Sequence, residues 1–277
     1  MLRFACPVCR APLWDMGQNL KCPKGHSFDK NKKGYVNLAL SAASGKKRHG
    51  DDKTMVISRR EFLEKGYYGP LRDEICRQAA NVQKDRIGLL DAGCGEGWYT
   101  SGVKTHLEST GKTVDALGID ISKDALIEAH KRDSSLLLAV AGANRLPVPD
   151  GECDVLLSIF APLFPDECSR VLSDEGVLIR AVPLREHLFG LKKAVYDEPY
   201  YNPDMDATLE GLQLISQTVV RYTLKLENNA DILSLFKMTR YYYKTGRDDQ
   251  AKLENLHYLE TELAFGVWVY RKEKEGI

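Results

Sequence analysis

The chain has 277 residues with 39 basic and 39 acidic side chains, and this formal net charge of zero does not by itself favour a nucleic-acid partner. Its 43% hydrophobic and 28% charged residues are ordinary for a soluble globular protein, with room for one large domain and a small module. No apolar run approaches the ~20 residues of a membrane helix, and the start lacks a signal peptide, so we expect a cytoplasmic protein. The seven cysteines, an odd number, argue against a disulfide framework.

The charges are distributed unevenly along the chain. Residues 1–55 contain eleven Lys and Arg against four Asp and Glu, a net charge of +7, so the remainder carries −7. A basic segment joined to an acidic body predicts that the N-terminal part meets a polyanion. The alternative is a solvated basic face.

The first motif is a set of metal-binding side chains with the spacing C-x2-C-x12-C-x3-H, formed by Cys6, Cys9, Cys22 and His26. Two close pairs separated by a short loop can place four ligands tetrahedrally around one zinc ion. Such a Cys3His set leaves no open coordination position, so we expect a structural zinc that stabilises a small ribbon or knuckle. A redox C-x-x-C pair or incidental cysteines are the alternatives.

The zinc-binding module extends to residue 40. Lys30, Lys32 and Lys33 lie beside Phe28 and Tyr35 in the sequence, a mixture that suits an RNA backbone and stacked bases. A segment with its aromatic side chains packed inward is an equally good interpretation.

A polar segment separates this module from the rest of the chain. Residues 41–54 have little apolar content and no periodicity, which predicts a flexible basic linker or a loop that the substrate orders. Lys46, Lys47 and Arg48 within it could contact phosphates. We therefore predict a zinc-binding RNA-recognition module at 1–40, the linker at 41–54 and a larger domain at 55–277.

The larger domain begins with two predicted helices and continues with alternating strands and helices. The helices are expected at 55–65 and 71–82, then at 98–107, 123–132, 166–172, 186–195 and 230–236. The strands are expected at 87–92, 114–120, 136–141, 154–159, 177–182, 212–226 and 257–271. This alternation predicts an α/β fold with a doubly wound, mostly parallel sheet whose ligand lies at the carboxyl ends of the strands.

A glycine-rich turn follows the first strand of this sheet. The segment Asp91-Ala92-Gly93-Cys94-Gly95-Glu96-Gly97 fails the dinucleotide fingerprint G-x-G-x-x-G because Trp98 occupies the third position. Its D-x-G-x-G-x-G form resembles the first motif of S-adenosylmethionine-dependent methyltransferases. An acid about 20 residues later should meet the ribose hydroxyls, and Asp120 satisfies this expectation. A glycine-rich turn without a ligand is the alternative.

Other candidate residues lie near the expected sheet edge. Asn144 follows the third strand, where a side chain or backbone group can bond the adenine edge, although an ordinary surface loop is as good an interpretation. Phe160 follows the fourth strand and is either a stacking platform or a core residue. His187 is expected at the start of a helix, and a lone histidine is more often structural.

Taken together, these motifs resemble the bacterial 23S rRNA (guanine-N1)-methyltransferases. The resemblance rests on the zinc ligands, Gly34–Leu38, Arg59–Leu63, Gly69, Gly93–Gly97 and Ala161-Pro162, and is strongest over residues 5–200. It implies a Rossmann-like class I methyltransferase with a seven-stranded sheet, and a zinc module that recognises an rRNA hairpin loop near the peptide exit tunnel. It also implies a homodimer whose cleft receives the RNA. Carried over by residue, Tyr68, Gly95, Glu96 and His187 resemble cofactor contacts.

The implied reaction is direct transfer of a methyl group to guanine N1. That nitrogen lies on the Watson–Crick edge, so the base must be unpaired or flipped out and held in line with the sulfonium methyl. Asp166 and Glu167 are candidates for a general base, although both are more often helix N-terminal acids. A small-molecule methyltransferase with a structural zinc knuckle, and a noncatalytic RNA- or protein-binding scaffold, remain alternatives.

Overall fold

The computed structural model describes residues 1–39 and 50–273. Residues 41–49 of the predicted linker, with Lys46, Lys47 and Arg48, lie outside the described residues. Within the described ranges, no helix is both long and apolar enough to cross a membrane.

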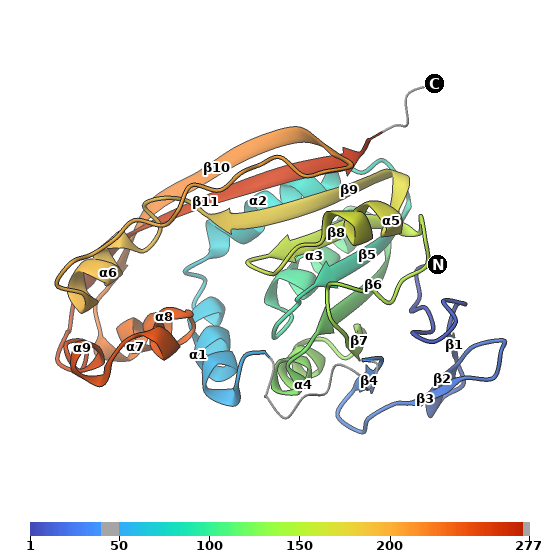
Figure 1. Ribbon diagram of the computed structural model, residues 1–277, viewed down its shortest axis with the longest axis horizontal. Helices are drawn as coiled ribbons and strands as arrows, with labels where there is room; N and C mark the ends of the chain where they lie inside the picture. Colours follow the sequence, from blue (N-terminus) through green and yellow to red (C-terminus); the bar gives the residue numbers. More distant parts are fainter. Residues whose placement is uncertain (40–49, 274–277) are drawn as a thin grey trace.

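A large mixed sheet forms the centre of the molecule (Figure 1). In the described part of the chain it has eight strands in the order β10-β11-β9-β8-β5-β6-β7-β4. Their bounds are β4 Tyr35–Asn37, β5 Arg86–Ala92, β6 Thr113–Asp120, β7 Leu137–Val140, β8 Cys153–Ile159, β9 Leu172–Pro183, β10 Leu212–Leu226 and β11 Leu259–Lys272. Strands β4 to β9 pair in parallel, and β11 runs antiparallel to both β9 and β10. The strand order reverses between β5 and β8, where doubly wound sheets bind their ligands.

Different elements cover the two faces of this sheet. Because side chains alternate along a strand, Leu89 of β5 packs with helices α1 to α4 on one face, and Leu90 packs with the N-terminal module and α5 on the other. The helices are α1 Lys53–Glu64, α2 Gly69–Ala80, α3 Trp98–Ser109, α4 Lys123–Arg132, α5 Pro165–Val171, α6 Phe189–Val195, α7 Asn229–Lys237, α8 Tyr241–Lys244 and α9 Arg247–Ala251. The module therefore shares a hydrophobic core with the sheet.

The N-terminal module also extends the sheet. Its own three-stranded sheet consists of β1 Trp14–Asp15, β2 Asn19–Lys21 and β3 Ser27–Asp29. Strand β4 then pairs with β7, with Val36 opposite Ala139. The sequence predicted seven strands in the large sheet, and that number was wrong because this short module strand adds an eighth edge strand. The register places the module next to the carboxyl ends of β6 and β7.

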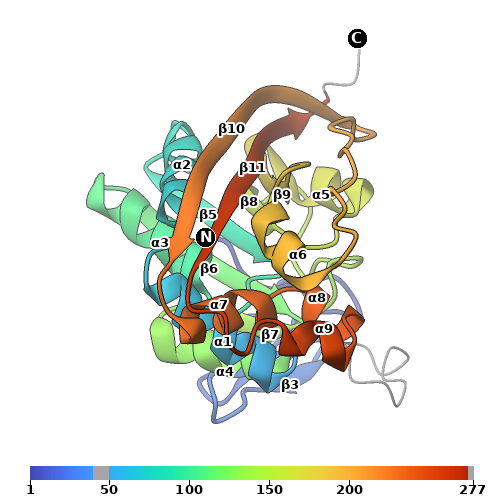
Figure 2. The same ribbon diagram turned by 90° about the vertical axis from the view of Figure 1, so that its left-hand side faces the viewer.

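The C-terminal part of the chain forms the opposite edge of the large sheet. Strands β10 and β11 form a long antiparallel pair, and α7 to α9 lie between them in the chain. Figures 1 and 2 both show α7 next to α1. The carboxylate of Asp231 in α7 accepts a hydrogen bond from the Tyr67 hydroxyl at 2.6 Å and pairs with Lys65. This anchors the C-terminal helices to the segment between α1 and α2.

Candidate active site and metal centre

A cavity of about 2140 Å³ lies at the carboxyl ends of the parallel strands. Its walls come from the glycine-rich loop after β5, the loops after β6, β7 and β8, helix α1 and the segment around Met238. Residues of the N-terminal module, including Cys6 and Arg10, line the same cavity. The module and the sheet therefore form one continuous site.

The glycine-rich loop leaves space that side chains would fill. Gly93 has φ 96°, and a Cβ built on it would lie 2.7 Å from the Ala161 Cβ. Gly97, with φ 79°, precedes the first residue of α3, and a Cβ there would lie 3.1 Å from the Ala129 Cβ. The loop thus requires glycine at both positions, and the N-terminus of α3 begins directly behind it.

Asp120 organises the loop from the end of β6. One of its carboxylate oxygens accepts a hydrogen bond from the Gly95 amide at 3.0 Å, and the other from the Ser122 amide at 2.7 Å. Burial raises the pKa of Asp120, although these two amide donors oppose the shift. The acid predicted from its distance along the sequence therefore lies directly beside the glycine-rich loop.

Three buried polar atoms of the cavity wall lack a hydrogen-bond partner within the described residues. They are Asp91 Oδ1, Glu96 Oε1 and the Tyr99 hydroxyl. Asp91 Oδ2 accepts from the Thr100 hydroxyl at 2.6 Å, yet burial raises the pKa of Asp91 to about 7. Buried polar groups normally have partners. These atoms therefore fit the amino-acid end of adenosylmethionine, which carries an ammonium group.

His187 and Tyr68 form a buried aromatic wall of the cavity. Nδ1 of His187 accepts a hydrogen bond from the Ala264 amide at 3.4 Å, so the neutral ring carries its proton on Nε2. Burial lowers the pKa of His187 to about 3. Its ring lies 4.6 Å from that of Phe265 and 6.2 Å from that of Tyr68. His187 can therefore donate a hydrogen bond but is a poor base near neutral pH.

The helix expected at 186–195 begins later than predicted. Leu188 has φ 60° and caps the helix, so α6 starts at Phe189. That prediction was wrong at its first residues because the left-handed Leu188 leaves His187 in the preceding turn.

Phe160 and Asn144 lie at the outer part of the site. Phe160 has φ 55°, is 39% exposed and lines the cavity, which favours the stacking alternative over a core position. Asn144 is exposed and lines the cavity, and its side-chain oxygen would lie 2.6 Å from a Cβ built on Gly142. The amide thus folds back over the loop, and its contact with adenine stays a prediction.

The two candidate general bases, Asp166 and Glu167, lie in the first turn of α5. The Glu167 carboxylate accepts from the Leu146 amide at 2.7 Å and binds Arg170 at 2.8 Å. Asp166 is exposed in the first turn, and neither carboxylate lines the cavity. The alternative of helix N-terminal acids is therefore favoured for both.

Cys6, Cys9, Cys22 and His26 meet in one cluster, with all ligand atoms within 4.8 Å of one another. The Cys9 and Cys22 sulfurs are 3.7 Å apart, and Nδ1 of His26 lies 3.3 Å from the Cys22 sulfur and 3.5 Å from that of Cys6. Ligands at about 2.3 Å from a tetrahedral zinc are separated by roughly 3.8 Å. The donor set and its spacing therefore fit one structural zinc ion.

Sequence reasoning assigned no role to one cavity residue, Arg59 of α1. It lay within the segment Arg59–Leu63 on which the family resemblance partly rested, but nothing in the pattern separated it from Arg60. Only the packing of α1 against the glycine-rich loop distinguishes the two side chains.

Known proteins match both parts of the chain. A zinc-ribbon family described as "RlmA, N-terminal" matches residues 4–40, and a family described as "Methyltransferase domain" matches residues 90–180. YxjB of Bacillus subtilis (strain 168), provisionally named a 23S rRNA (guanine-N1)-methyltransferase, is 32% identical over 262 residues, covering 91% of each chain. The chain belongs to this methyltransferase family. It uses S-adenosylmethionine and contains a zinc ribbon.

One further relative supports this assignment, and one solved structure shares the fold. The 23S rRNA (guanine(748)-N1)-methyltransferase of Streptomyces fradiae is 32% identical over 235 residues, covering 81% of this chain and 80% of that protein. The structure of a provisionally named type II methyltransferase from Anaeromyxobacter dehalogenans shares the fold, with a TM-score of 0.50 and 18% identity. It covers 72% of this chain and 95% of that one. The predicted class I fold is confirmed.

Proposed function

We propose that this methyltransferase transfers the methyl group of S-adenosylmethionine to N1 of one guanine in a loop of 23S rRNA, and that the zinc module helps to hold the RNA. The observation that carries the proposal is the shared cavity, because Cys6, Pro7 and Arg10 of the module line the same space as the glycine-rich loop. A zinc knuckle with a purely structural role in a small-molecule enzyme has no need to form that wall.

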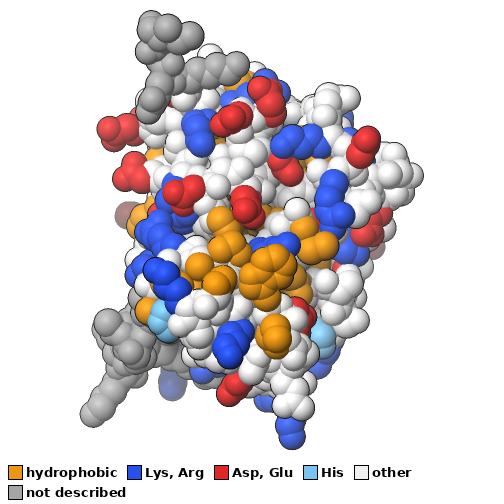
Figure 3. Space-filling model, turned by 90° about the vertical axis from the view of Figure 1, so that its right-hand side faces the viewer, with side chains coloured by type: hydrophobic (Ala, Val, Ile, Leu, Met, Phe, Trp, Pro, Cys, Tyr) orange, Lys and Arg blue, Asp and Glu red, His pale blue; other side chains and the backbone are white. Residues whose placement is uncertain are grey.

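The charge of the outer cavity supports a nucleic-acid substrate. Arg10, Lys33 and Arg145 are exposed and line the cavity, and Arg180 lies partly buried on the same wall. Figure 3 shows basic and hydrophobic side chains together on the side of the molecule that carries the module. The Arg3 guanidinium lies 3.9 Å from the exposed Trp14 ring. Cations with exposed aromatics suit phosphates and unpaired bases.

The inner cavity supports specific roles for the predicted cofactor residues. The loop from Gly93 to Gly97, with Asp91 and Glu96, would hold the amino-acid end of adenosylmethionine. Asp120 would accept hydrogen bonds from the ribose hydroxyls, and Asn144 would meet the adenine edge. Tyr68 and His187 would close the cavity over the cofactor, with the Nε2–H of His187 as a donor.

The reaction depends mainly on how these residues position the base. When bound, adenosylmethionine supplies an electrophilic methyl group. The carboxylates among the described lining residues are Asp51, Asp91, Glu96, Asp120 and Asp124, and all come from the cofactor side. The wall formed by the ends of β8 and β9 instead offers Phe160, which can stack on a flipped guanine and align N1 with the methyl group. Positioning, rather than a carboxylate base on that wall, would supply most of the acceleration. The N1 proton would pass to water as N1 gains the methyl group and S-adenosylhomocysteine is released.

Two expectations drawn from the sequence belong to this proposal and stay predictions. The first is a homodimer whose cleft receives the RNA, and the second is a cytoplasmic location. The division into a module at 1–40, a linker at 41–54 and a catalytic domain at 55–277 is likewise part of the proposal, with the qualification that β4 joins the module to the sheet.

The test is methyl transfer from labelled adenosylmethionine to unmodified large-subunit rRNA, followed by primer extension. N1-methylguanine blocks base pairing, so we expect one arrest at one loop guanine. Asp120→Asn should reduce the transfer at least tenfold, because it weakens the contact proposed for the ribose. Asp115→Asn, a matched change at the other end of β6, should retain most activity. Cofactor binding without label in any RNA would contradict the proposal and favour a small-molecule acceptor.

A further inference from the structure

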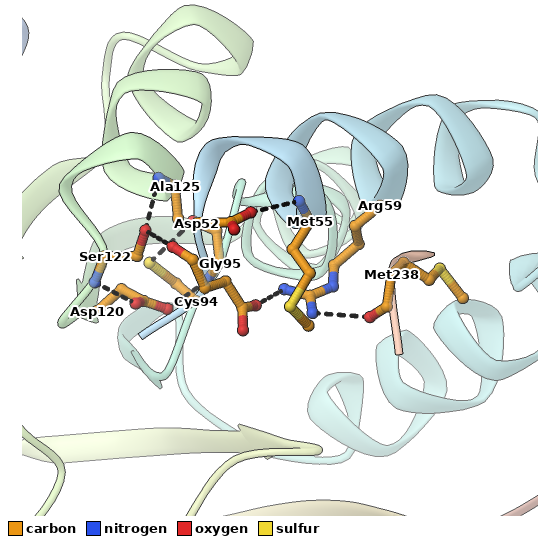
Figure 4. Close-up of polar contacts among 10 residues, drawn as sticks. Asp52, Met55, Arg59, Cys94, Gly95, Asp120, Ser122, Ala125 and Met238 are labelled. Carbon is orange, nitrogen blue, oxygen red and sulfur yellow. Dashed lines mark hydrogen bonds and ion pairs between the residues drawn. The ribbon is translucent and has the colours of Figure 1, made fainter. Parts of the chain in front are cut away.

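Arg59 projects from α1 into the inner cavity beside the glycine-rich loop. Figure 4 shows its guanidinium reaching between this loop and the backbone of Met238. One Nη1–H donates to the Asp51 carboxylate, and one Nη2–H donates to the Met238 carbonyl at 3.1 Å. An arginine has five N–H donors. Three of them therefore remain available as far as the described residues are concerned.

The open space above Gly95 faces this guanidinium. A Cβ built on Gly95 would lie 3.8 Å from Arg59 Nη1, and no other described atom outside its chain neighbours would lie within 4 Å of it. Burial disfavours the charged guanidinium, but the carboxylates of Asp51, Glu96 and Asp120 outweigh it and raise the pKa of Arg59. A permanent cation thus borders the space that the glycine-rich loop keeps free.

The amino-acid end of adenosylmethionine carries two opposite charges that need different partners. Its ammonium group suits the unpartnered oxygens of Asp91 and Glu96. Its carboxylate would be repelled by the same acids and needs a cation with several N–H donors. The planar fork of an arginine matches a carboxylate with two parallel hydrogen bonds.

We propose that Arg59 binds the methionine carboxylate of S-adenosylmethionine. The Asp51 carboxylate keeps the guanidinium aimed at this position. The backbone carbonyl of Asp51 accepts a hydrogen bond from the Ser122 hydroxyl at 2.7 Å, and this ties it to the loop after β6. The bond to Met238 also links the carboxylate site to the C-terminal helices, so the cofactor would hold α1 and this segment together.

The test compares two ligands that differ in this carboxylate. S-adenosylhomocysteine contains it, and the decarboxylated analogue S-adenosyl-3-thiopropylamine lacks it but keeps the amine. Titration calorimetry on the full-length wild-type chain should show S-adenosylhomocysteine binding about tenfold to a hundredfold more tightly. Equal affinity of the wild type for both ligands would overturn the proposal without any variant.

Variants then assign the preference to Arg59. In Arg59→Gln the preference should disappear, and binding of the decarboxylated analogue should change less than threefold. Arg59→Lys, which keeps the charge but loses the fork, should retain part of it. The matched control is Arg60→Gln on the same helix, since Arg60 pairs with Glu128 and does not line the cavity. If Arg59→Gln weakened the binding of both ligands equally, Arg59 would have a structural role and the proposal would be overturned.

This inference rests on the adenosylmethionine dependence of the proposed function and not on its RNA substrate. Both titrations are made without RNA. A failed rRNA assay therefore leaves the result of this test unaffected, and a failed titration leaves the rRNA assignment standing.

Discussion

Strands β5 and β8 are buried along almost their whole length, whereas β1, β2 and β3 of the zinc module have two or three residues each and are largely exposed. Burial of apolar side chains can therefore fix the sheet and the loops at its edge. The strands β1 to β3 bury few side chains of their own, so the order of the module depends on its zinc ligands as well as on the core that it shares with the sheet. Cofactor binding and RNA binding should consequently respond to different changes, although both regions line one cavity.

Removal of one zinc ligand should have the largest effect, and it should reduce RNA binding without reducing cofactor binding. Cys22→Ala leaves three ligands, so the module should lose its metal and its order, because zinc binding and folding are coupled. We expect rRNA affinity to fall more than a hundredfold, and adenosylmethionine affinity to change less than about threefold. Zinc analysis, filter binding and calorimetry measure the three quantities.

Cys168→Ala is the matched control for this change. Cys168 is a buried cysteine of α5 outside the metal cluster, and its truncation should cost about 1 kcal/mol of unfolding free energy while zinc and rRNA binding persist. Full rRNA affinity in metal-free Cys22→Ala would show that the module does not contribute to RNA binding.

Gly93→Ala should have the reverse effect, with a loss of cofactor binding and no loss of zinc. The new Cβ would lie 2.7 Å from the Ala161 Cβ at a residue with φ 96°, so the loop must move. Adenosylmethionine affinity should fall about tenfold to a hundredfold, while zinc content stays unchanged. Gly111→Ala has a similar φ of 86°, but no atom of the described residues outside its chain neighbours would lie within 4 Å of the new Cβ. It should lose stability without losing cofactor affinity, and equal losses of affinity in both variants would argue against a specific loop geometry.

His187 should give the sheet region a distinct response to acid. Its pKa falls from 6.5 in the unfolded chain to about 3 on folding, because burial disfavours the imidazolium. Stability is therefore complete above pH 6.5 and is lost as the pH falls toward 3, by about 2 kcal/mol at pH 5.

Comparison with His187→Gln isolates this contribution. The variant should lose less unfolding free energy than the wild type between pH 7 and pH 5, and the loss of zinc at low pH is common to both. Between pH 6 and pH 9 the shape of the rate profile should be the same in both proteins. A pH-dependent step that vanishes in the variant would assign His187 a role as a base.

The smallest effect is expected from the cations between the two regions. Arg145→Ala should weaken rRNA binding a few-fold and lower the salt slope of the affinity by about one, as expected for loss of one phosphate contact. Adenosylmethionine affinity should not change. Arg86→Ala removes an arginine that pairs with Asp115 on the far end of β6, and it should leave the salt slope unaltered. An unchanged slope in Arg145→Ala would remove this residue from the RNA path.

Most strands of the large sheet could be predicted from the sequence, but few of the contacts that form the walls of the cavity could be. The bounds predicted for the helix 123–132 and the strand 212–226 are those observed, because both have a clear apolar pattern and are followed directly by polar residues. Strand β4 was missed because three residues show no periodicity and their partner β7 lies roughly 100 residues later.

Some residues of the site could likewise be predicted from the sequence, and others could not. The metal ligands and the pair of Asp91 with Asp120 could be found from spacing alone, because local geometry fixes them. Arg59 reaches the loop through the packing of α1, and Phe160 combines a left-handed backbone with an exposed ring. Neither feature leaves a signal in one sequence.

The central claim is that one cavity, with a zinc module as its wall, methylates N1 of a single guanine. The most direct test is the quantity of 1-methylguanosine in unmodified 23S rRNA after incubation with the full-length chain and adenosylmethionine. It is measured by nucleoside digestion and mass spectrometry. We expect one mole of 1-methylguanosine per mole of 23S rRNA with the wild type, and almost none with zinc-free Cys22→Ala. Methyl groups on another nucleoside, or equal yields from both proteins, would contradict it.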